Sequence, residues 1–235
     1  YKAMRRLLIQ EWNKPLSGFV VTGLTGVNKT CFILSLKSPR APDLEAFAEH
    51  RGSAFGGLFQ ERPQPSQQSF ENALALGLYQ NRGGDFLFED ESRLIGRCVI
   101  PTPFFEKLRE LPRILLEANN EERSLHIYGE YIEKPLLRRT PEQVMELLVG
   151  QLRTLKNRLG GEACEAVEKS VREAFGVKNP AEAKALHCAW ILRLLNDYYD
   201  GLYKHAMARH PREPVFRGNA QECADWLRKN ADLLL

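Results

Sequence analysis

The sequence predicts an α/β fold, with a parallel sheet and flanking helices in residues 1–135, followed by an all-helical domain in residues 136–235. Three observations support this prediction. Short apolar runs alternate with helical patterns in the first part, as in βαβ units. A glycine-rich loop joins the first strand to a helix. Strand signals are absent after about Leu136, where four amphipathic segments follow instead.

The elements of the first part follow from their apolar patterns and end signals. The candidate strands are residues 19–22, 86–88, 98–100 and 113–117. The candidate helices are residues 29–36, 67–79 and 103–111. Ser66 precedes the second of these helices and is a good N-cap, because its hydroxyl can accept a hydrogen bond from a free backbone N–H.

The second part reads as helices at residues 141–159, 162–175, 181–209 and 219–233. Thr140 and Gln143 form a capping-box pattern around a proline at the first helical position. Residues 136–140 are the expected hinge between the two domains.

The composition is that of an ordinary folded protein, with 43% hydrophobic and 27% charged residues. The five cysteines contain no Cys-x-x-Cys pair, and neither cysteine nor histidine shows metal-ligand spacing, so we expect no disulfide framework and no metal centre. We expect the cysteines, Cys31 included, to pack in cores. No apolar run approaches the ~20 residues of a membrane helix. These features predict a cytoplasmic protein without membrane association.

The glycine-rich loop is the most informative motif of the sequence. Gly23 to Thr30 follow an apolar strand and precede an apolar helical run, which is the layout of a P-loop, and the predicted fold is therefore P-loop NTPase-like. In such a loop, backbone N–H groups and Lys29 bind phosphate, and the Thr30 hydroxyl can hold Mg²⁺. The phosphate-binding residues are Gly23, Gly26, Asn28, Lys29 and Thr30. Asn28 replaces the second glycine of the pattern, and asparagine tolerates the left-handed conformation better than other residues with side chains.

An acidic residue after a neighbouring strand is the usual partner of a P-loop. Residues 89–91 are Glu-Asp-Glu and directly follow the candidate strand 86–88, so Glu89 or Asp90 is the expected partner, with Lys29 as the third catalytic residue. A glycine-rich segment at residues 50–57 suits close approach to an anionic ligand. The candidate substrate-binding residues are Asp43, His50, Arg51, Gly52, Ser53, Arg93 and Arg97.

The net charge of +3 is small, and its whole excess lies in residues 136–235. Phosphate contacts to RNA require Arg and Lys side chains. The candidate tRNA-binding residues are therefore Arg138, Arg139, Arg153 and Lys156, of which the last two share a helix face by their spacing.

Taken in order, several motifs resemble tRNA 2-selenouridine synthases, in the part that follows their rhodanese-like domain. The resemblance is dense from Tyr1 to about Ile132 and looser beyond. It is carried by Gly-Leu-Thr-Gly-Val-x-Lys-Thr at 23–30, Asp-Leu-Glu at 43–45, His-Arg-Gly-Ser-Ala-Phe-Gly-Gly at 50–57, Gln-Pro-Ser-Gln at 64–67, Phe-Glu-Asn at 70–72, and Glu-Asp-Glu-Ser-Arg-Leu-Ile-Gly at 89–96.

The resemblance implies a tRNA-modifying transferase that acts on wobble 2-thiouridine. Such enzymes use geranyl diphosphate to make an S-geranylated intermediate and selenophosphate to replace sulfur by selenium. Both donors are phosphorus anions, so a phosphate-binding loop fits this chemistry without ATP hydrolysis. The resemblance also implies tRNA and a rhodanese-like domain as partners, the latter carrying the reactive cysteine of the family, either fused or as a separate chain. The first six residues, Tyr-Lys-Ala-Met-Arg-Arg, look like the junction that follows that domain.

Two other functions fit the sequence. A small-molecule kinase or general NTPase is favoured by residues 113–119 followed by Glu122 and Arg123, which resemble the strand-to-arginine segment of nucleoside kinases. A tRNA-binding module without catalysis is favoured by Asn28, if that residue marks a degenerate loop.

Overall fold

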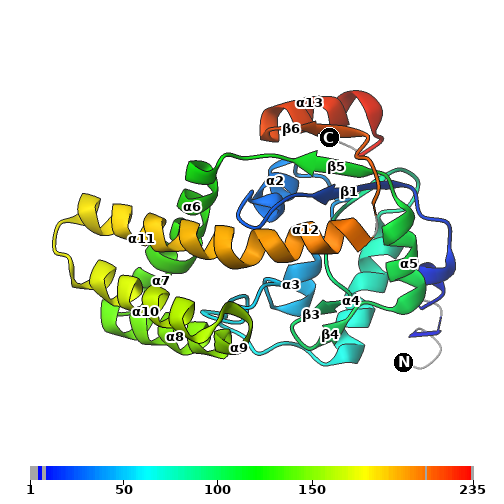
Figure 1. Ribbon diagram of the computed structural model, residues 1–235. Coiled ribbons are helices and arrows are strands. Elements are labelled where there is room, and N and C mark those ends of the chain that lie inside the picture. Colours follow the sequence, from blue (N-terminus) through cyan, green and yellow to red (C-terminus); the bar gives the residue numbers. More distant parts are fainter. Residues whose placement is uncertain (1–4, 7–8, 210, 234–235) are drawn as a thin grey trace. The chain divides into compact units, whose positions relative to one another are not determined.

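The structure is a computed structural model that describes residues 5–6, 9–209 and 211–233 (Figure 1). The chain forms two compact units. The first comprises Tyr1–Gly23, Lys29–Glu117 and Arg212–Leu235, and the second comprises Leu24–Asn28 and Ala118–Pro211. This grouping differs from a single boundary after residue 135, because the C-terminal residues belong to the unit that contains the sheet.

A four-stranded parallel sheet lies at the centre of the first unit, in the order β2-β1-β5-β6. The strands are β1 (Gly18–Thr22), β2 (Phe86–Glu89), β5 (Arg113–Leu116) and β6 (Phe216–Gly218). β1 pairs with β2 in a register that places Val21 opposite Glu89. Because parallel strands point the same way, the residues that follow β1 and β2 meet at one edge of the sheet. The predicted α/β class is confirmed.

β6 is the element that the sequence pattern missed, and the prediction that no strand follows Leu136 is wrong. β6 pairs in parallel with β5, Phe216 lying opposite Ile114. The helix α13 (Ala220–Asn230) follows, and the ring of its Trp226 lies 5.5 Å from Phe216 and 5.4 Å from Phe19, measured between ring centroids. A three-residue strand is too short to show a two-residue period. The segment 219–233 therefore covers the sheet and is no part of the helical unit.

The candidate strand 98–100 is also placed differently from the prediction. Cys98–Val99 form β4, which pairs antiparallel with β3 (Leu94–Ile95) in a separate two-stranded ribbon. Gly96 lies between the two strands with φ of +59°, the left-handed conformation that glycine adopts without cost. The turn at Gly96 allows β4 to pair with β3, outside the parallel sheet.

The main core of the first unit lies between one face of the sheet and its helices. These helices are α3 (Leu44–Ala48), α4 (Gln67–Gln80), α5 (Thr102–Glu110) and the 3₁₀ helix η1 (Gln10–Asn13), whereas α2 (Lys29–Ser35) contributes no residue to this core. Phe70 and Leu74 of α4 are fully buried, and Phe88 packs edge to face against Phe104 at 5.5 Å. Ser66 accepts a hydrogen bond from the Ser69 N–H, which confirms the predicted N-cap.

The second unit is helical apart from its loops. Its helices are α6 (Asn120–Tyr128), α7 (Lys134–Leu136), α8 (Pro141–Thr154), α9 (Lys156–Leu159), α10 (Gly161–Gly176), α11 (Pro180–Leu194) and α12 (Asp200–Arg209), with π turns at η2 (Gly129–Glu133) and η3 (Leu195–Tyr199). The predicted helical segments of this region are confirmed, and Thr140 and Gln143 form the expected capping box. Within the described part of the chain, no helix has the length and apolar character needed to cross a membrane.

Candidate functional site

The glycine-rich loop begins where β1 ends at Thr22 and finishes where α2 begins at Lys29. Gly26 has φ of +87° and Asn28 has φ of +68°, so both lie in the left-handed region. Asparagine reaches this region because its short polar side chain tolerates it. Asn28 therefore adopts the backbone conformation for which a glycine would otherwise be needed.

Lys29 and Thr30 both contact the carboxylate of Glu89, which ends β2. The Thr30 hydroxyl donates to Glu89 Oε2 at 2.7 Å, and Lys29 Nζ lies 3.6 Å from Glu89 Oε1. Lys29 Nζ also donates to the Gly23 carbonyl at 3.1 Å. The pairing of β1 with β2 brings these residues together, although they lie 59 and 60 positions apart in the sequence.

Asp90 occupies a different position from its neighbour. Its side chain accepts a hydrogen bond from the Thr22 hydroxyl at 2.7 Å, and its N–H donates to the Val21 carbonyl at 2.9 Å. These contacts fix the end of β1. The geometry therefore favours Glu89 over Asp90 as the acidic partner of the loop.

Two further carboxylates, Glu45 of α3 and Glu91, lie beside Glu89. One oxygen from each of the three residues lies within 4.8 Å of the others, a set that could hold a cation. Burial, followed by repulsion from Glu89, raises the pKa of Glu45 to about 9 and that of Glu91 to about 8. The sequence predicted no metal centre, because cysteine and histidine show no metal-ligand spacing; the fold brings the three carboxylates together.

Gly52 of the glycine-rich segment lies against two of these carboxylates, those of Glu91 and Glu45. It has φ of +64°, and a Cβ atom there would lie 2.8 Å from Glu91 Oε2 and 2.9 Å from Glu45 Oε1. Only glycine allows the backbone to approach so closely. The segment 50–57 is thus built around the acidic residues.

The other predicted substrate-binding residues have local contacts. Asp43 is the N-cap of α3 and accepts a hydrogen bond from the Ala46 N–H at 2.8 Å. His50 Nδ1 accepts from the Gly52 N–H at 3.1 Å, and burial lowers the pKa of His50. The Arg51 N–H donates to the Gly56 carbonyl, and the Ser53 N–H donates to the Arg51 carbonyl. These bonds shape the turns of the segment.

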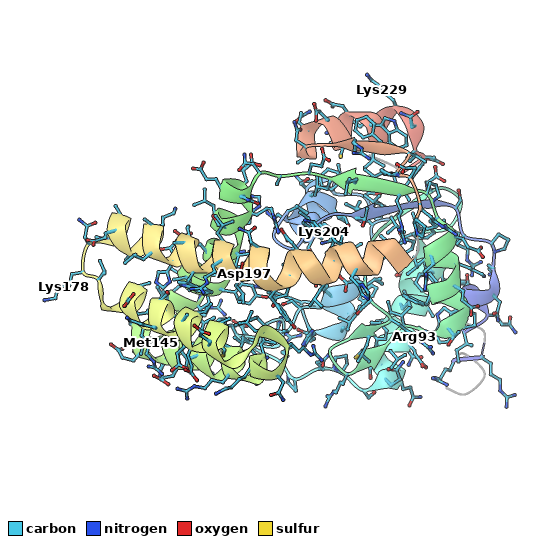
Figure 2. The ribbon with its side chains drawn as sticks, viewed as in Figure 1. Arg93, Met145, Lys178, Asp197, Lys204 and Lys229 are labelled. Carbon is cyan, nitrogen blue, oxygen red and sulfur yellow. The ribbon has the colours of Figure 1, made fainter. Side chains whose placement is uncertain are left out.

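Arg93 and Arg97 flank the β3–β4 ribbon and are exposed; Figure 2 labels Arg93. Arg93 Nη2 donates to Thr102 Oγ1 at 2.7 Å, and the Arg97 N–H donates to Gln64 Oε1 at 2.8 Å. Their contacts in the structure are thus with Thr102 and Gln64. A role in substrate binding stays a prediction for both arginines.

Residues 24–28 of the loop belong to the second unit, and Arg123 of α6 contacts them there. Its side chain is 1% exposed, and its Nε donates to the Thr25 carbonyl at 2.9 Å. Asp200 accepts from both terminal nitrogens of Arg123, at 3.1 and 2.5 Å. His126 Nδ1 lies 3.0 Å from the Gly26 carbonyl. This role of Arg123 was not predicted from the sequence. The capping-box pattern of Asn119 and Glu122 indicates the start of the helix that carries Arg123.

The candidate tRNA-binding residues fall into two groups. Arg153 forms a two-pronged ion pair with Glu168, at 2.9 and 2.6 Å, and Lys156 lies 3.3 Å from Glu165, so acidic side chains of α10 partly neutralise both. Arg138 is exposed and Arg139 is half-buried, between α7 and α8. The structure leaves their binding to tRNA as a prediction.

The cysteines are free, and Cys98, Cys164 and Cys223 are buried as expected. Cys31 is exposed, so the expectation that it packs in the core is wrong. Cys31 lies two residues after Lys29, in the first turn of α2. Successive side chains point in different directions around a helix, and that of Cys31 faces solvent.

A parallel sheet, a loop from β1 into α2, and an acidic residue ending the adjacent strand define a P-loop NTPase-like α/β fold. The chain belongs to the family of the tRNA 2-selenouridine synthase AAA domain, whose family model matches residues 16–233.

Three relatives named tRNA 2-selenouridine synthase resemble the chain over nearly its whole length. The protein from Marinobacter nauticus is 34% identical over 97% of this chain, that from Aeromonas salmonicida 37% over 96%, and that from Alcanivorax borkumensis 36% over 97%. The chain covers 65%, 64% and 66% of these relatives, respectively. No solved structure matches this chain.

Proposed function

We propose that the chain is the phosphate-binding part of an enzyme that modifies 2-thiouridine at the wobble position of tRNA. The names of the curated relatives support tRNA modification. The observation that carries the proposal is the contact of Lys29 and Thr30 with Glu89 at the end of the neighbouring strand. Such a loop suits a phosphorus anion, and geranyl diphosphate and selenophosphate are the proposed donors.

In the geranyl step, the sulfur of 2-thiouridine attacks C1 of geranyl diphosphate. A C–S bond forms, the C–O bond breaks, diphosphate leaves with the electron pair, and the base loses its N3 proton to solvent. Negative charge grows on the departing oxygen. The Lys29 ammonium and the N–H groups of the loop would oppose that charge, and donors fixed in advance stabilise a transition state most effectively. Selenophosphate, a second phosphorus anion, suits the same loop.

The donor set also fits Mg²⁺, which prefers oxygen ligands. The Thr30 hydroxyl and the Glu89 carboxylate, 2.7 Å apart, are the residues that would hold it. When bound, the ion would neutralise charge on the departing diphosphate.

The charge state of the acidic residues is compatible with an anionic donor. Burial and the neighbouring carboxylates raise the pKa of Glu45 to about 9 and that of Glu91 to about 8, which favours the neutral form of these carboxyls. Glu89 lies beside Lys29, with Nζ 3.6 Å from Oε1. This arrangement limits the repulsion that three ionised carboxylates would exert on a phosphate group.

Partners and location belong to the same proposal. Arg138 and Arg139 would contact tRNA phosphates, a rhodanese-like domain would supply the reactive cysteine, and the enzyme would act in the cytoplasm. Arg123 does not support the kinase alternative, because its guanidinium is buried against Asp200. Asn28 does not support the alternative of a degenerate loop, because it adopts the left-handed conformation that the glycine of the pattern would adopt, at φ of +68°.

The test is geranyl transfer by the purified chain. Transfer RNA that carries wobble 2-thiouridine is incubated with geranyl diphosphate, and the nucleosides are analysed by mass spectrometry. We expect S-geranyl-2-thiouridine from the wild type, and at least ~10²-fold slower formation with Lys29→Ala, because one charge-stabilising donor is lost. Lys229→Ala is the matched control, since Lys229 is exposed on α13 (Figure 2). Absence of product from the wild type, or equal rates for Lys29→Ala, would contradict the proposal.

A further inference from the structure

A cavity of about 360 Å³ lies at the edge of the sheet opposite the glycine-rich loop. Residues 15–17, which precede β1, and Gly83 and Gly84, which precede β2, line it. The loop follows the other end of β1. A strand of five residues spans about 16 Å, so the cavity and the loop are separate places in the first unit.

The walls of the cavity combine apolar and cationic side chains. Leu78, Phe86 and Phe104 supply apolar surface, and Lys14, Arg82 and Lys107 supply positive charge. Glu11 is the one carboxylate among the lining residues, and it accepts hydrogen bonds from Lys14 at 2.6 Å and from Arg82. Three cations against one carboxylate favour an anion.

Trp12 adds an unsatisfied donor to this wall. Trp12 is among the lining residues and is 7% exposed, and its indole N–H is buried without an acceptor among the described residues. Buried polar groups are rarely left without a partner, because the loss of water is then uncompensated. A ligand in the cavity would lie beside Trp12, and the indole N–H signal of this residue can report on it.

The cations are held in place before any ligand arrives. The Arg82 guanidinium lies 4.1 Å from the centre of the Tyr79 ring and is bound by Glu11. Lys107 Nζ donates to the Trp12 carbonyl at 2.6 Å and to the Lys14 carbonyl at 2.5 Å. Fixed groups lose little conformational freedom on binding, which favours affinity. Burial lowers the pKa of Lys107, and a nearby anion would raise it again.

We propose that this cavity is a second ligand site, which binds a small organic anion. Its acidic group, a carboxylate or a phosphate monoester, meets Arg82 and Lys107, and its apolar body lies against Leu78, Phe86 and Phe104. The volume falls in the range of small-molecule sites. This site is independent of the donor site at the loop.

The indole N–H signals of the three tryptophans provide the test. In ¹⁵N-labelled chain, Trp12→Phe assigns the Trp12 signal, and the wild type is then titrated with phenyl phosphate, benzoate and inorganic phosphate. We expect phenyl phosphate or benzoate to shift the Trp12 signal saturably, while Trp190, which donates to His187, serves as the internal reference. The organic anion that binds identifies the preferred acidic group.

The variants distinguish this site from the loop. Arg82→Gln should weaken binding at least tenfold, whereas Arg228→Gln, at an exposed arginine of α13, and Lys29→Ala should leave it unchanged. Lys107→Met is a second variant should Arg82→Gln fold poorly. The proposal is overturned if neither organic anion shifts the Trp12 signal saturably, if inorganic phosphate binds as tightly as phenyl phosphate, or if the cavity variants bind like wild type.

Discussion

The buried ion pair between Arg123 and Asp200 offers a quantitative prediction about the helical unit. Arg123→Met keeps an unbranched chain of similar length but removes the donors to Asp200 and to the Thr25 carbonyl. The Asp200 side chain is 12% exposed and would keep its charge without a counter-ion. Breaking a buried pair on one side costs about 3–5 kcal/mol. We expect a loss of unfolding free energy of that size.

Urea unfolding followed by ¹⁹F NMR of fluorotryptophan-labelled chain measures this loss, because Trp190 reports from the helical unit. With a urea dependence of about 2 kcal/mol/M, the midpoint of the Trp190 signal should fall by roughly 1.5–2.5 M. Arg123→Met combined with Asp200→Leu should recover much of the loss, since no unpaired charge remains.

Arg153→Met is the matched control. Arg153 is exposed and pairs with Glu168, and exposed pairs contribute about 0–1 kcal/mol. If Arg123→Met lowered the stability by no more than Arg153→Met does, the claim that Arg123 anchors the loop segment would be wrong.

Three other predictions concern the loop and the carboxylates. Asn28→Gly should tighten pyrophosphate binding in calorimetry, because glycine adopts φ of +68° without strain and removes a side chain from the loop; weaker binding would mean that the Asn28 side chain contributes a contact. Gly52→Ala should lower the unfolding free energy by about 1–2 kcal/mol, since alanine is strained at φ of +64°; an unchanged urea midpoint would contradict this reasoning. Burial raises the pKa of Glu91 from 4.5 to about 8, so its stabilising effect is full below pH 4.5 and is lost as the pH rises through 8. Without divalent cations, the melting temperature should therefore fall less between pH 5 and pH 9 in Glu91→Gln than in wild type, and parallel curves would refute it.

The sequence predicted the loop and its acidic partner because both are encoded locally. Gly23 to Thr30 specify a strand-to-helix turn by residue type, and Glu89 follows a short apolar run of the kind found in buried strands. Once the two strands are parallel and adjacent, the contact between Thr30 and Glu89 follows from topology.

The parts that the sequence did not reveal depend on contacts distant along the chain. Glu45 reaches the site from the short helix α3, which no periodic pattern marks. Arg123 meets Thr25 and Asp200, which lie 98 and 77 residues away. β6 is defined by its pairing with β5 and carries only three residues. In each case the tertiary partner, absent from the local pattern, determines the role.

Calorimetric titration with pyrophosphate tests the central claim most directly, since that claim assigns phosphate binding to the loop and Lys29. The titration is done with and without Mg²⁺. Under each condition, the wild-type chain and the exposed-lysine variant Lys229→Ala should bind pyrophosphate with equal affinity. Lys29→Ala should bind at least tenfold more weakly, because it lacks the cation that lies beside Glu89 and Gly23. Equal affinity of Lys29→Ala and wild type, or no binding by the wild-type chain, would contradict the account.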